Sequence, residues 1–245
     1  MKRILIRMLQ MKKILIIVPA FNEEDSLSYV IENIIYNFPQ YDYIIINDGS
    51  TDSTKSLCKE KGYECINLPV NLGLGNAIRT GMLYAERKGY KYVVQIDGDG
   101  QHLPEYIENM IKKMEETGAD IVIGSRYASN KKPLTMRMLG SRIISASIRL
   151  TTGGKRVEDV TSGMRLFNRK VISRYCKDMH YSPEPDTLAY LINCGFKIEE
   201  VQVDMKERYA GVSYLSSLNS LNYMVRMLFS ILIFQWVRVR RKKGE

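Results

Sequence analysis

The chain has 245 residues, of which 45% are hydrophobic, so it can form a domain that buries about 70% of its unfolded surface without disulfides or structural metals. Its four cysteines form no Cys-x-x-Cys pair, which argues against a zinc site or a disulfide framework and favours a reducing cytosol. The net charge of +9 is concentrated in the last eight residues, where five Arg or Lys side chains favour an anionic surface as a partner.

The start of the chain predicts no secretory signal. Residues 1–10 are basic, but Arg7 interrupts their apolar positions and no small-residue cleavage site follows. Met11 opens a second, cleaner start. We therefore interpret residues 1–10 as a candidate upstream extension, residues 11–213 as the main domain and residues 214–245 as a C-terminal helix with a basic tail.

Strands and helices alternate along the first half of the chain. Apolar runs predict buried strands at 14–18, 43–46, 65–68, 92–96 and 120–123, and apolar residues at helical spacing predict helices at 26–36, 51–61, 77–87 and 106–116. This alternation favours an α/β fold with a mostly parallel sheet covered on both faces. After residue 130 the pattern is weaker and predicts a helix at 134–150, a polar loop at 153–160 and a strand at 199–205.

Polar residues follow three of the predicted strands at their carboxyl ends. They lie at 21–24, 48–50 and 97–102, and this is the edge where ligands of such sheets bind. Asp97 and Asp99, two residues apart, can direct both carboxylates at one hard divalent cation, Mn²⁺ or Mg²⁺, which would bridge the phosphates of a nucleotide-sugar. A single Asp-x-Asp pattern is a weak signal, since Asp-Gly pairs are common in turns.

Competing motifs fit the same segments less well. In a calcium EF-hand loop starting at Asp97, the required glycine position is His102 and position eight is Pro104, so that interpretation fails. Gly73-Leu74-Gly75 lacks the third glycine of a dinucleotide fingerprint, and no segment has the spacing of a P-loop. No nucleic-acid-binding module is visible either.

Taken together, seven segments resemble the family 2 glycosyltransferases of GT-A fold, and among them the polyprenyl-phosphate sugar transferases of the dolichol-phosphate mannosyltransferase type. They lie at 18–24, 47–52, 71–75, 97–102, 123–127, 161–165 and 207–213. The resemblance implies an inverting transferase with nucleotide contacts at Pro19, Glu23 and Asp48, a donor contact at Gly75, and metal contacts at Asp97, Asp99 and Gln101. Met164 and the segment 183–186 depart from the family pattern, which leaves the sugar and the acceptor open.

The acceptor decides which further residues act. A hydroxyl acceptor needs a general base, and by family analogy Asp159, Glu184 and Asp186 are the acids on the acceptor side. A phosphate acceptor needs cations instead, and Arg126, Arg165 and Arg208 are then the expected clamp. Polyprenyl phosphate is our first hypothesis, with a glycan hydroxyl of an envelope polysaccharide as the alternative.

The end of the chain bears on the same choice. Residues 218–237 predict an amphipathic helix too short to span a bilayer, which would lie in the membrane interface with Trp236 at headgroup depth. A helix docked on the domain, or in the interface of a homo-oligomer, remains open. Outside glycosyltransferases, a non-catalytic nucleotide-sugar binder that scaffolds a membrane complex is an alternative, as is a nucleotidyltransferase.

Overall fold

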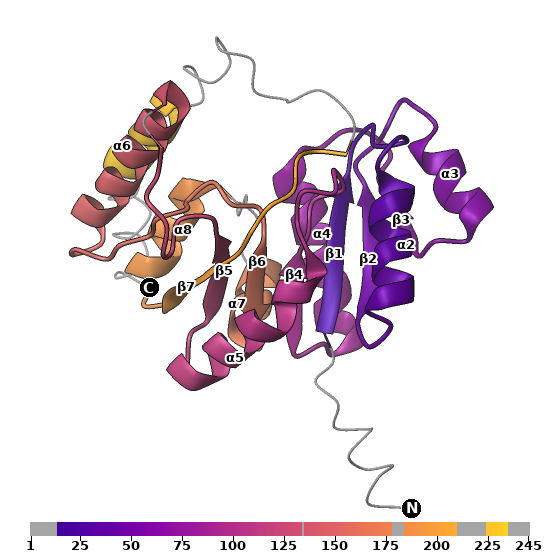
Figure 1. The fold of residues 1–245 in the computed structure, drawn as a ribbon, viewed down its shortest axis with the longest axis horizontal. Helices are drawn as coiled ribbons and strands as arrows, with labels where there is room; N and C mark the ends of the chain where they lie inside the picture. The colour runs from indigo at the N-terminus through magenta and orange to yellow at the C-terminus, as the bar shows by residue number, and fades with distance from the viewer. Residues whose placement is uncertain (1–13, 134, 178–183, 210–223, 235–245) are drawn as a thin grey trace, which may run out of the picture.

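The computed structural model describes residues 14–133, 135–177, 184–209 and 224–234 (Figure 1). The strands are β1 (Ile14–Ala20), β2 (Asp42–Asn47), β3 (Cys65–Asn67), β4 (Tyr92–Gln95), β5 (Ile121–Ser125), β6 (Arg165–Asn168) and β7 (Ile198–Gln202). The α-helices are α2 (Leu27–Asn37), α3 (Thr54–Lys61), α4 (Leu74–Lys88), α5 (Ile107–Thr117), α6 (Met136–Thr151), α7 (Arg169–Lys177) and α8 (Pro185–Asn193). A 3-10 turn, η1 (Pro104–Tyr106), precedes α5, and residues 224–234 form a further helix that ends in the π-helical turn η2 (Ser230–Phe234).

The strands form one sheet in the order β3-β2-β1-β4-β6-β5-β7. Of the described strands, β6 runs antiparallel to its neighbours β4 and β5, and every other pairing is parallel. Helices cover both faces of the sheet (Figure 1). The mostly parallel α/β architecture that the sequence predicts is therefore confirmed.

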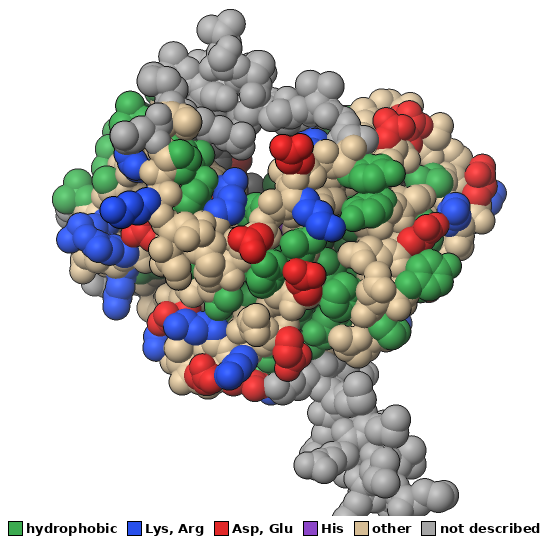
Figure 2. Space-filling model, in the orientation of Figure 1, with side chains coloured by type: hydrophobic (Ala, Val, Ile, Leu, Met, Phe, Trp, Pro, Cys, Tyr) green, Lys and Arg blue, Asp and Glu red, His purple; other side chains and the backbone are tan. Residues whose placement is uncertain are grey.

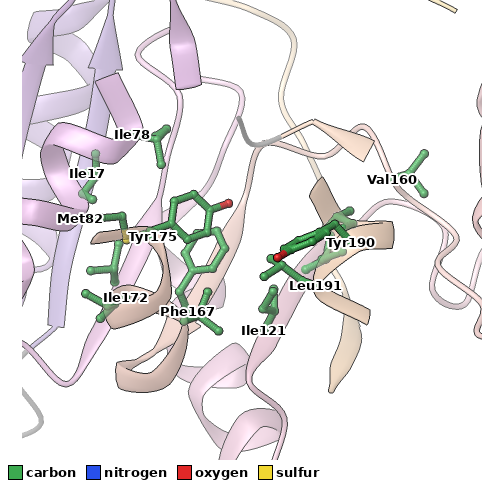
Figure 3. Close-up of a cluster of buried hydrophobic side chains, with 14 of the residues drawn as sticks. Ile17, Ile78, Met82, Ile121, Val160, Phe167, Ile172, Tyr175, Tyr190 and Leu191 are labelled. Carbon is green, nitrogen blue, oxygen red and sulfur yellow. The ribbon is translucent and has the colours of Figure 1, made fainter. Parts of the chain in front are cut away.

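Alternate residues of β1 face two separate hydrophobic clusters. Leu15 and Ile17 pack with α4 and α7 on one face of the sheet, while Ile16 and Val18 pack with α2 and α5 on the other. In the first cluster the rings of Phe167 and Tyr175 meet edge to face at 5.7 Å (Figure 3). Burial on both faces explains why β1 is an uninterrupted apolar run.

The sequence pattern misses β6, α7 and α8. The strand β6 has four residues and begins with a buried arginine, Arg165, so it contains no apolar run that could identify it. In α7, a helix of nine residues, the buried side chains are Val171, Ile172 and Tyr175, and most of the other positions are charged. Both elements are too short for periodicity to identify them.

The C-terminal helix, residues 224–234, packs against α6 and α8. Met227 and Ile231 are buried, and Gly140 of α6 lies directly against the sulfur of Met224. The remainder of the predicted helix 218–237, including Trp236, and the basic tail lie outside the described residues. Within the part of the chain that the structure describes, no helix is long and apolar enough to cross a membrane.

The loops that follow β1 and β2 are joined by short polar contacts. The side chain of Asn22 accepts from the Thr51 N–H (2.8 Å), and the Asn22 N–H donates to Ser50 Oγ (3.0 Å). Gly49 has φ +67°, and a Cβ there would overlap the backbone of Val70 and Asn71. Glycine is therefore required at this position both by the backbone conformation and by close packing.

We predict that Gly49→Ala destabilises the protein more than Gly62→Ala does. Gly62 has nearly the same φ, +68°, but nothing lies near its Cβ position, so its replacement costs only the left-handed conformation, about 1–2 kcal/mol. Gly49→Ala adds a collision with backbone, which costs about 1–3 kcal/mol more. Urea unfolding of the two variants measures the difference, and equal losses would show that the collision is relieved without cost.

Candidate functional site

The candidate site lies where the strand order reverses. β1 is flanked by β2, which follows it in the chain, and by β4, from which the chain continues to the other half of the sheet. The Ile96 N–H donates to Ile17 O (3.0 Å), and Ser26 Oγ lies 2.8 Å from Gly98 O. The loops after β1 and β4 are thus side by side at such a switch point, where ligands of open α/β sheets bind.

Glu23 belongs to the loop after β1 and lies beside the loop after β4. Its backbone N–H donates to Thr54 Oγ1 (3.0 Å), and its Oε2 lies 2.6 Å from Ser26 Oγ. Burial raises the pKa of Glu23 above its ordinary value, and the negative charges of Asp99 and Asp97 raise it further. The structure thereby brings three of the acids that the sequence singles out into one neighbourhood.

Asp48 at the end of β2 is almost buried and supports the next loop. Its Oδ1 accepts from the Leu72 N–H (2.9 Å) and its Oδ2 accepts from the Gly73 N–H (2.8 Å). Gly75 stands two residues further on, in the first turn of α4. Pro19 lies near the end of β1, and its carbonyl oxygen is 3.3 Å from the position of a Cβ on Gly98. Asp48, Gly75 and Pro19, which are predicted to contact the nucleotide-sugar donor, therefore lie near the ends of adjacent strands.

Asp97 and Asp99 differ in their exposure and contacts. The Asp97 side chain is 35% exposed, and its Oδ1 accepts from Gln95 Nε2 (3.1 Å). The Asp99 side chain is only 7% exposed; its Oδ1 accepts from the Gln101 N–H (3.0 Å) and its Oδ2 lies 3.0 Å from Arg208 Nη2. Asp99 is therefore a buried carboxylate paired with Arg208, whereas Asp97 is accessible to solvent.

The segment after β7 lies across the Asp97–His102 loop. The Tyr209 N–H donates to Asp99 O (3.0 Å), and the Lys206 N–H donates to Gln101 O (3.0 Å). The ring of Tyr209 stacks on that of Tyr29 from α2, with centroids 4.6 Å apart. Gln101 Nε2 lies 3.4 Å from Lys206 O. The side-chain oxygen of Gln101 therefore points away from Lys206 O. These contacts place Arg208, predicted as a phosphate ligand, beside the predicted metal ligands.

The residues present fit a hard divalent cation bound together with substrate. Asp97, Asp99 and Gln101 offer carboxylate and amide oxygens, the ligands that Mg²⁺ and Mn²⁺ prefer. Among the described residues, no three His, Cys, Asp or Glu side chains form a group that could hold a metal by themselves. Donor phosphates and water would have to complete the coordination, which is the usual arrangement at phosphate-bound Mg²⁺.

The partly exposed Arg126 forms a bidentate ion pair with the buried Asp159. Arg126 donates through Nε to Oδ2 (2.7 Å), through Nη2 to Oδ1 (2.8 Å) and through its backbone N–H to Oδ2 (3.0 Å). Burial of Asp159 opposes ionisation, but the Arg126 hydrogen bonds outweigh it, so the pKa of Asp159 lies below its ordinary value. Since a strongly stabilised carboxylate is a weak base, the structure does not favour Asp159 as the general base.

Arg165, which the sequence predicts as part of a phosphate clamp, lies inside the fold. It is 1% exposed, and it donates to Ser162 O (2.9 Å) and Val160 O (3.0 Å). This burial does not favour Arg165 as a direct phosphate ligand. Arg165 supports the turn that carries Asp159, because β6 begins at this residue and turns its side chain into the interior.

Glu184 and Asp186 lie at the start of α8, in contact with the C-terminal helix. Glu184 Oε1 is 3.0 Å from Arg226 Nη2, and Asp186 Oδ2 accepts from Ser230 Oγ (2.7 Å). Burial raises the pKa of Glu184, and the Arg226 cation only partly offsets this. The structure thus groups these two acids with Arg226 and Ser230.

Several residues of the site were not predicted from the sequence. Lys132 is 9% exposed, with its Nζ near Ser141 Oγ (3.3 Å) and Ser145 Oγ (3.4 Å), and burial lowers its pKa. His102 and Gln95 contact Asp97 directly. The polar sequence around Asp97 was the available signal for His102 and Gln95, whereas no local sequence pattern indicates a role for Lys132.

The chain is similar in sequence to known sugar transferases. The chain is 28% identical over 221 residues to polyprenol monophosphomannose synthase from Mycolicibacterium smegmatis, covering 85% of this chain and 83% of that protein. It is 30% identical over 237 residues to UDP-N-acetylglucosamine–dolichyl-phosphate N-acetylglucosaminyltransferase from Methanococcus voltae, covering 85% and 90%. Both relatives are named as sugar transferases.

A similar solved structure confirms the fold. Glucosyl-3-phosphoglycerate synthase from Mycobacterium tuberculosis, crystallised with Mn²⁺, UDP-glucose and phosphoglyceric acid, superposes with a TM-score of 0.67 at 21% identity, covering 91% of this chain and 79% of that one. The GT-A fold and the glycosyltransferase activity expected from the resemblance are confirmed. Because the model of the family described as "Glycosyl transferase family 2" matches residues 15–176, more than half of the chain, the protein belongs to that family.

Proposed function

We propose that the protein transfers a sugar, with inversion, from a nucleoside-diphosphate sugar to polyprenyl phosphate at the cytosolic membrane face, for cell-envelope glycans. The observation that carries this proposal is the grouping of Glu23, Asp97 and Asp99 with Arg208 at the switch point of the sheet. The names of the mycobacterial and archaeal relatives support a polyprenyl-phosphate acceptor.

On the donor side, the loops after β1 and β2 would bind the nucleoside. Glu23 and Asp48 are the acceptors for base or ribose hydroxyl and N–H groups, with Pro19 and Gly75 beside them. Asp97, Asp99 and Gln101 would hold a divalent cation, which when bound neutralises the charge that develops on the leaving diphosphate. Arg208 is placed to add positive charge at the same point, since it already lies 3.0 Å from Asp99.

On the acceptor side, the geometry favours a phosphate over a hydroxyl group. Each of the three acids predicted as a general base is already engaged: Asp159 by Arg126, Glu184 by Arg226 and Asp186 by Ser230. Arg126, whose side chain is 27% exposed, offers a partly accessible guanidinium. An anionic phosphate nucleophile needs such cations and no base.

A two-helix apolar surface supports membrane association. The C-terminal helix buries Met227 and Ile231, while its opposite side exposes Val225, Phe229, Leu232 and Ile233. The adjacent α6 exposes Leu139, Ile143 and Leu150 along one stripe, and its sequence contains arginines but no acid. Figure 2 shows hydrophobic side chains gathered over α6 with Lys and Arg side chains beside them. An apolar stripe bordered by cations fits an anionic bilayer surface.

We expect the double variant Asp97→Asn/Asp99→Asn to lose transferase activity while remaining folded. Removing two carboxylates removes the cation that stabilises the leaving diphosphate, a loss of several kcal/mol or about 1000-fold in rate. Turnover of the preferred UDP- or GDP-sugar with Mn²⁺ measures it, with Glu116→Gln, an exposed acid of α5, as the control. Activity close to that of the wild type would refute the metal assignment.

The acceptor is tested by direct competition. The protein is incubated with labelled UDP-glucose, UDP-GlcNAc or GDP-mannose, Mn²⁺, and either undecaprenyl phosphate or an oligosaccharide. We expect a lipid-extractable, acid-labile product with undecaprenyl phosphate. Product formed only with the saccharide would contradict the phosphate acceptor. The acceptor would then be a hydroxyl group, and the reaction would require a general base not yet identified.

We further predict that Phe229→Glu and Leu139→Glu reduce binding to phosphatidylglycerol vesicles. Each change places a charge on the apolar two-helix surface, which opposes its burial in the lipid interface. Tyr36→Glu is the matched control, because Tyr36 is 76% exposed on α2, distant from α6 (Figure 1). Equal co-sedimentation of all three variants with vesicles would contradict a membrane role for this surface. A wild-type dimer that Phe229→Glu dissociates would instead assign the surface to an oligomer interface.

A further inference from the structure

Asp97 is held by contacts from its own segment and from a distant one. Its backbone N–H donates to Nδ1 of His102 (3.0 Å), its Oδ1 accepts from Gln95 Nε2 of β4 (3.1 Å), and its Oδ2 packs against Gly163. His102 and Gly163 have no part in the donor or acceptor contacts described above. Both lie directly against Asp97.

The contact with His102 is directed from the backbone to the ring. A backbone N–H can only donate, so Nδ1 of His102 is the acceptor in this contact. The His102 side chain is 4% exposed, so its acceptor atom is fixed by packing and the turn after β4 closes on it.

Gly163 forms a wall beside the Asp97 carboxylate. A Cβ at this position would overlap Asp97 Oδ2 and would lie 2.9 Å from both Asp97 Cγ and His102 Cε1. The backbone here is restrained, because Ser162 Oγ donates to Gly124 O (2.6 Å) and the Gly124 N–H donates to Met164 O (2.9 Å). A side chain at 163 would therefore displace the carboxylate rather than the backbone.

We infer that His102 and Gly163 are positioning residues for the metal ligand Asp97. His102 sets the backbone of Asp97 by accepting its N–H, and Gly163 leaves the space in which the carboxylate lies. This inference rests on the proposed metal-dependent function and assigns both residues an indirect role. Groups behind a metal ligand typically change metal affinity by about 10–100-fold when they are removed.

The test measures Mn²⁺ affinity in the presence of UDP or GDP, whichever the wild-type protein binds more tightly, from the electron paramagnetic resonance signal of free Mn²⁺. His102→Leu and His102→Asn form a matched pair of nearly equal size. Asn places an acceptor, Oδ1, on the γ carbon as His does, whereas Leu places a methyl group there. We expect a loss of about 10–100-fold for His102→Leu and for Gly163→Ala, and substantial rescue in His102→Asn.

Activity as a function of Mn²⁺ concentration gives a second readout. A positioning role raises the Mn²⁺ concentration needed for half-maximal rate, and the rate at saturating Mn²⁺ recovers; a damaged fold would not recover. Unchanged Mn²⁺ affinity in His102→Leu, or equal losses in His102→Leu and His102→Asn, would overturn the inference even if Gly163→Ala fails to fold. If the wild-type protein binds no Mn²⁺ with either nucleotide, the metal-dependent function fails together with the inference.

Discussion

The parallel pairing of β1 with β4 is the constraint on which the site depends. It places Ile17 beside Gln95 in register, and the two strands then end next to each other. The loop carrying Glu23 and the loop carrying Asp97 and Asp99 consequently meet, joined through Ser26 and Gly98. Since these loops are 72 residues apart in sequence, their contact exists only because the hydrophobic clusters on both faces of β1 hold the sheet in this order.

Partly exposed arginines pair with two of the acids collected around this edge. Asp99 is paired with Arg208 and Asp159 with Arg126, and both carboxylates are nearly inaccessible to solvent. Leaving either acid buried without its partner would be strongly unfavourable, by about 3–5 kcal/mol. The two pairs therefore restrain the loops that carry them, and Asp97 remains the more exposed acid.

The C-terminal helix connects the proposed acceptor side of the site to the proposed membrane surface. Arg226 and Ser230 contact Glu184 and Asp186 at the start of α8, while Phe229, one residue before Ser230, faces outward. One side of this helix is docked on the domain, and the other exposes an apolar stripe. A bilayer held there would lie next to the acids and cations of the acceptor side.

The sequence by itself determined the α/β class, most strands of the first half, and the edge at which polar residues gather, because long apolar runs and turn residues are local signals. Only the tertiary structure decided the reversed strand β6, the burial of Arg165 and the engagement of Asp159 by Arg126. The same holds for Gly163, whose importance depends on Asp97, a residue from a different strand end. Contacts between segments far apart in the chain leave no periodic trace, so they could not be predicted from residue type and spacing.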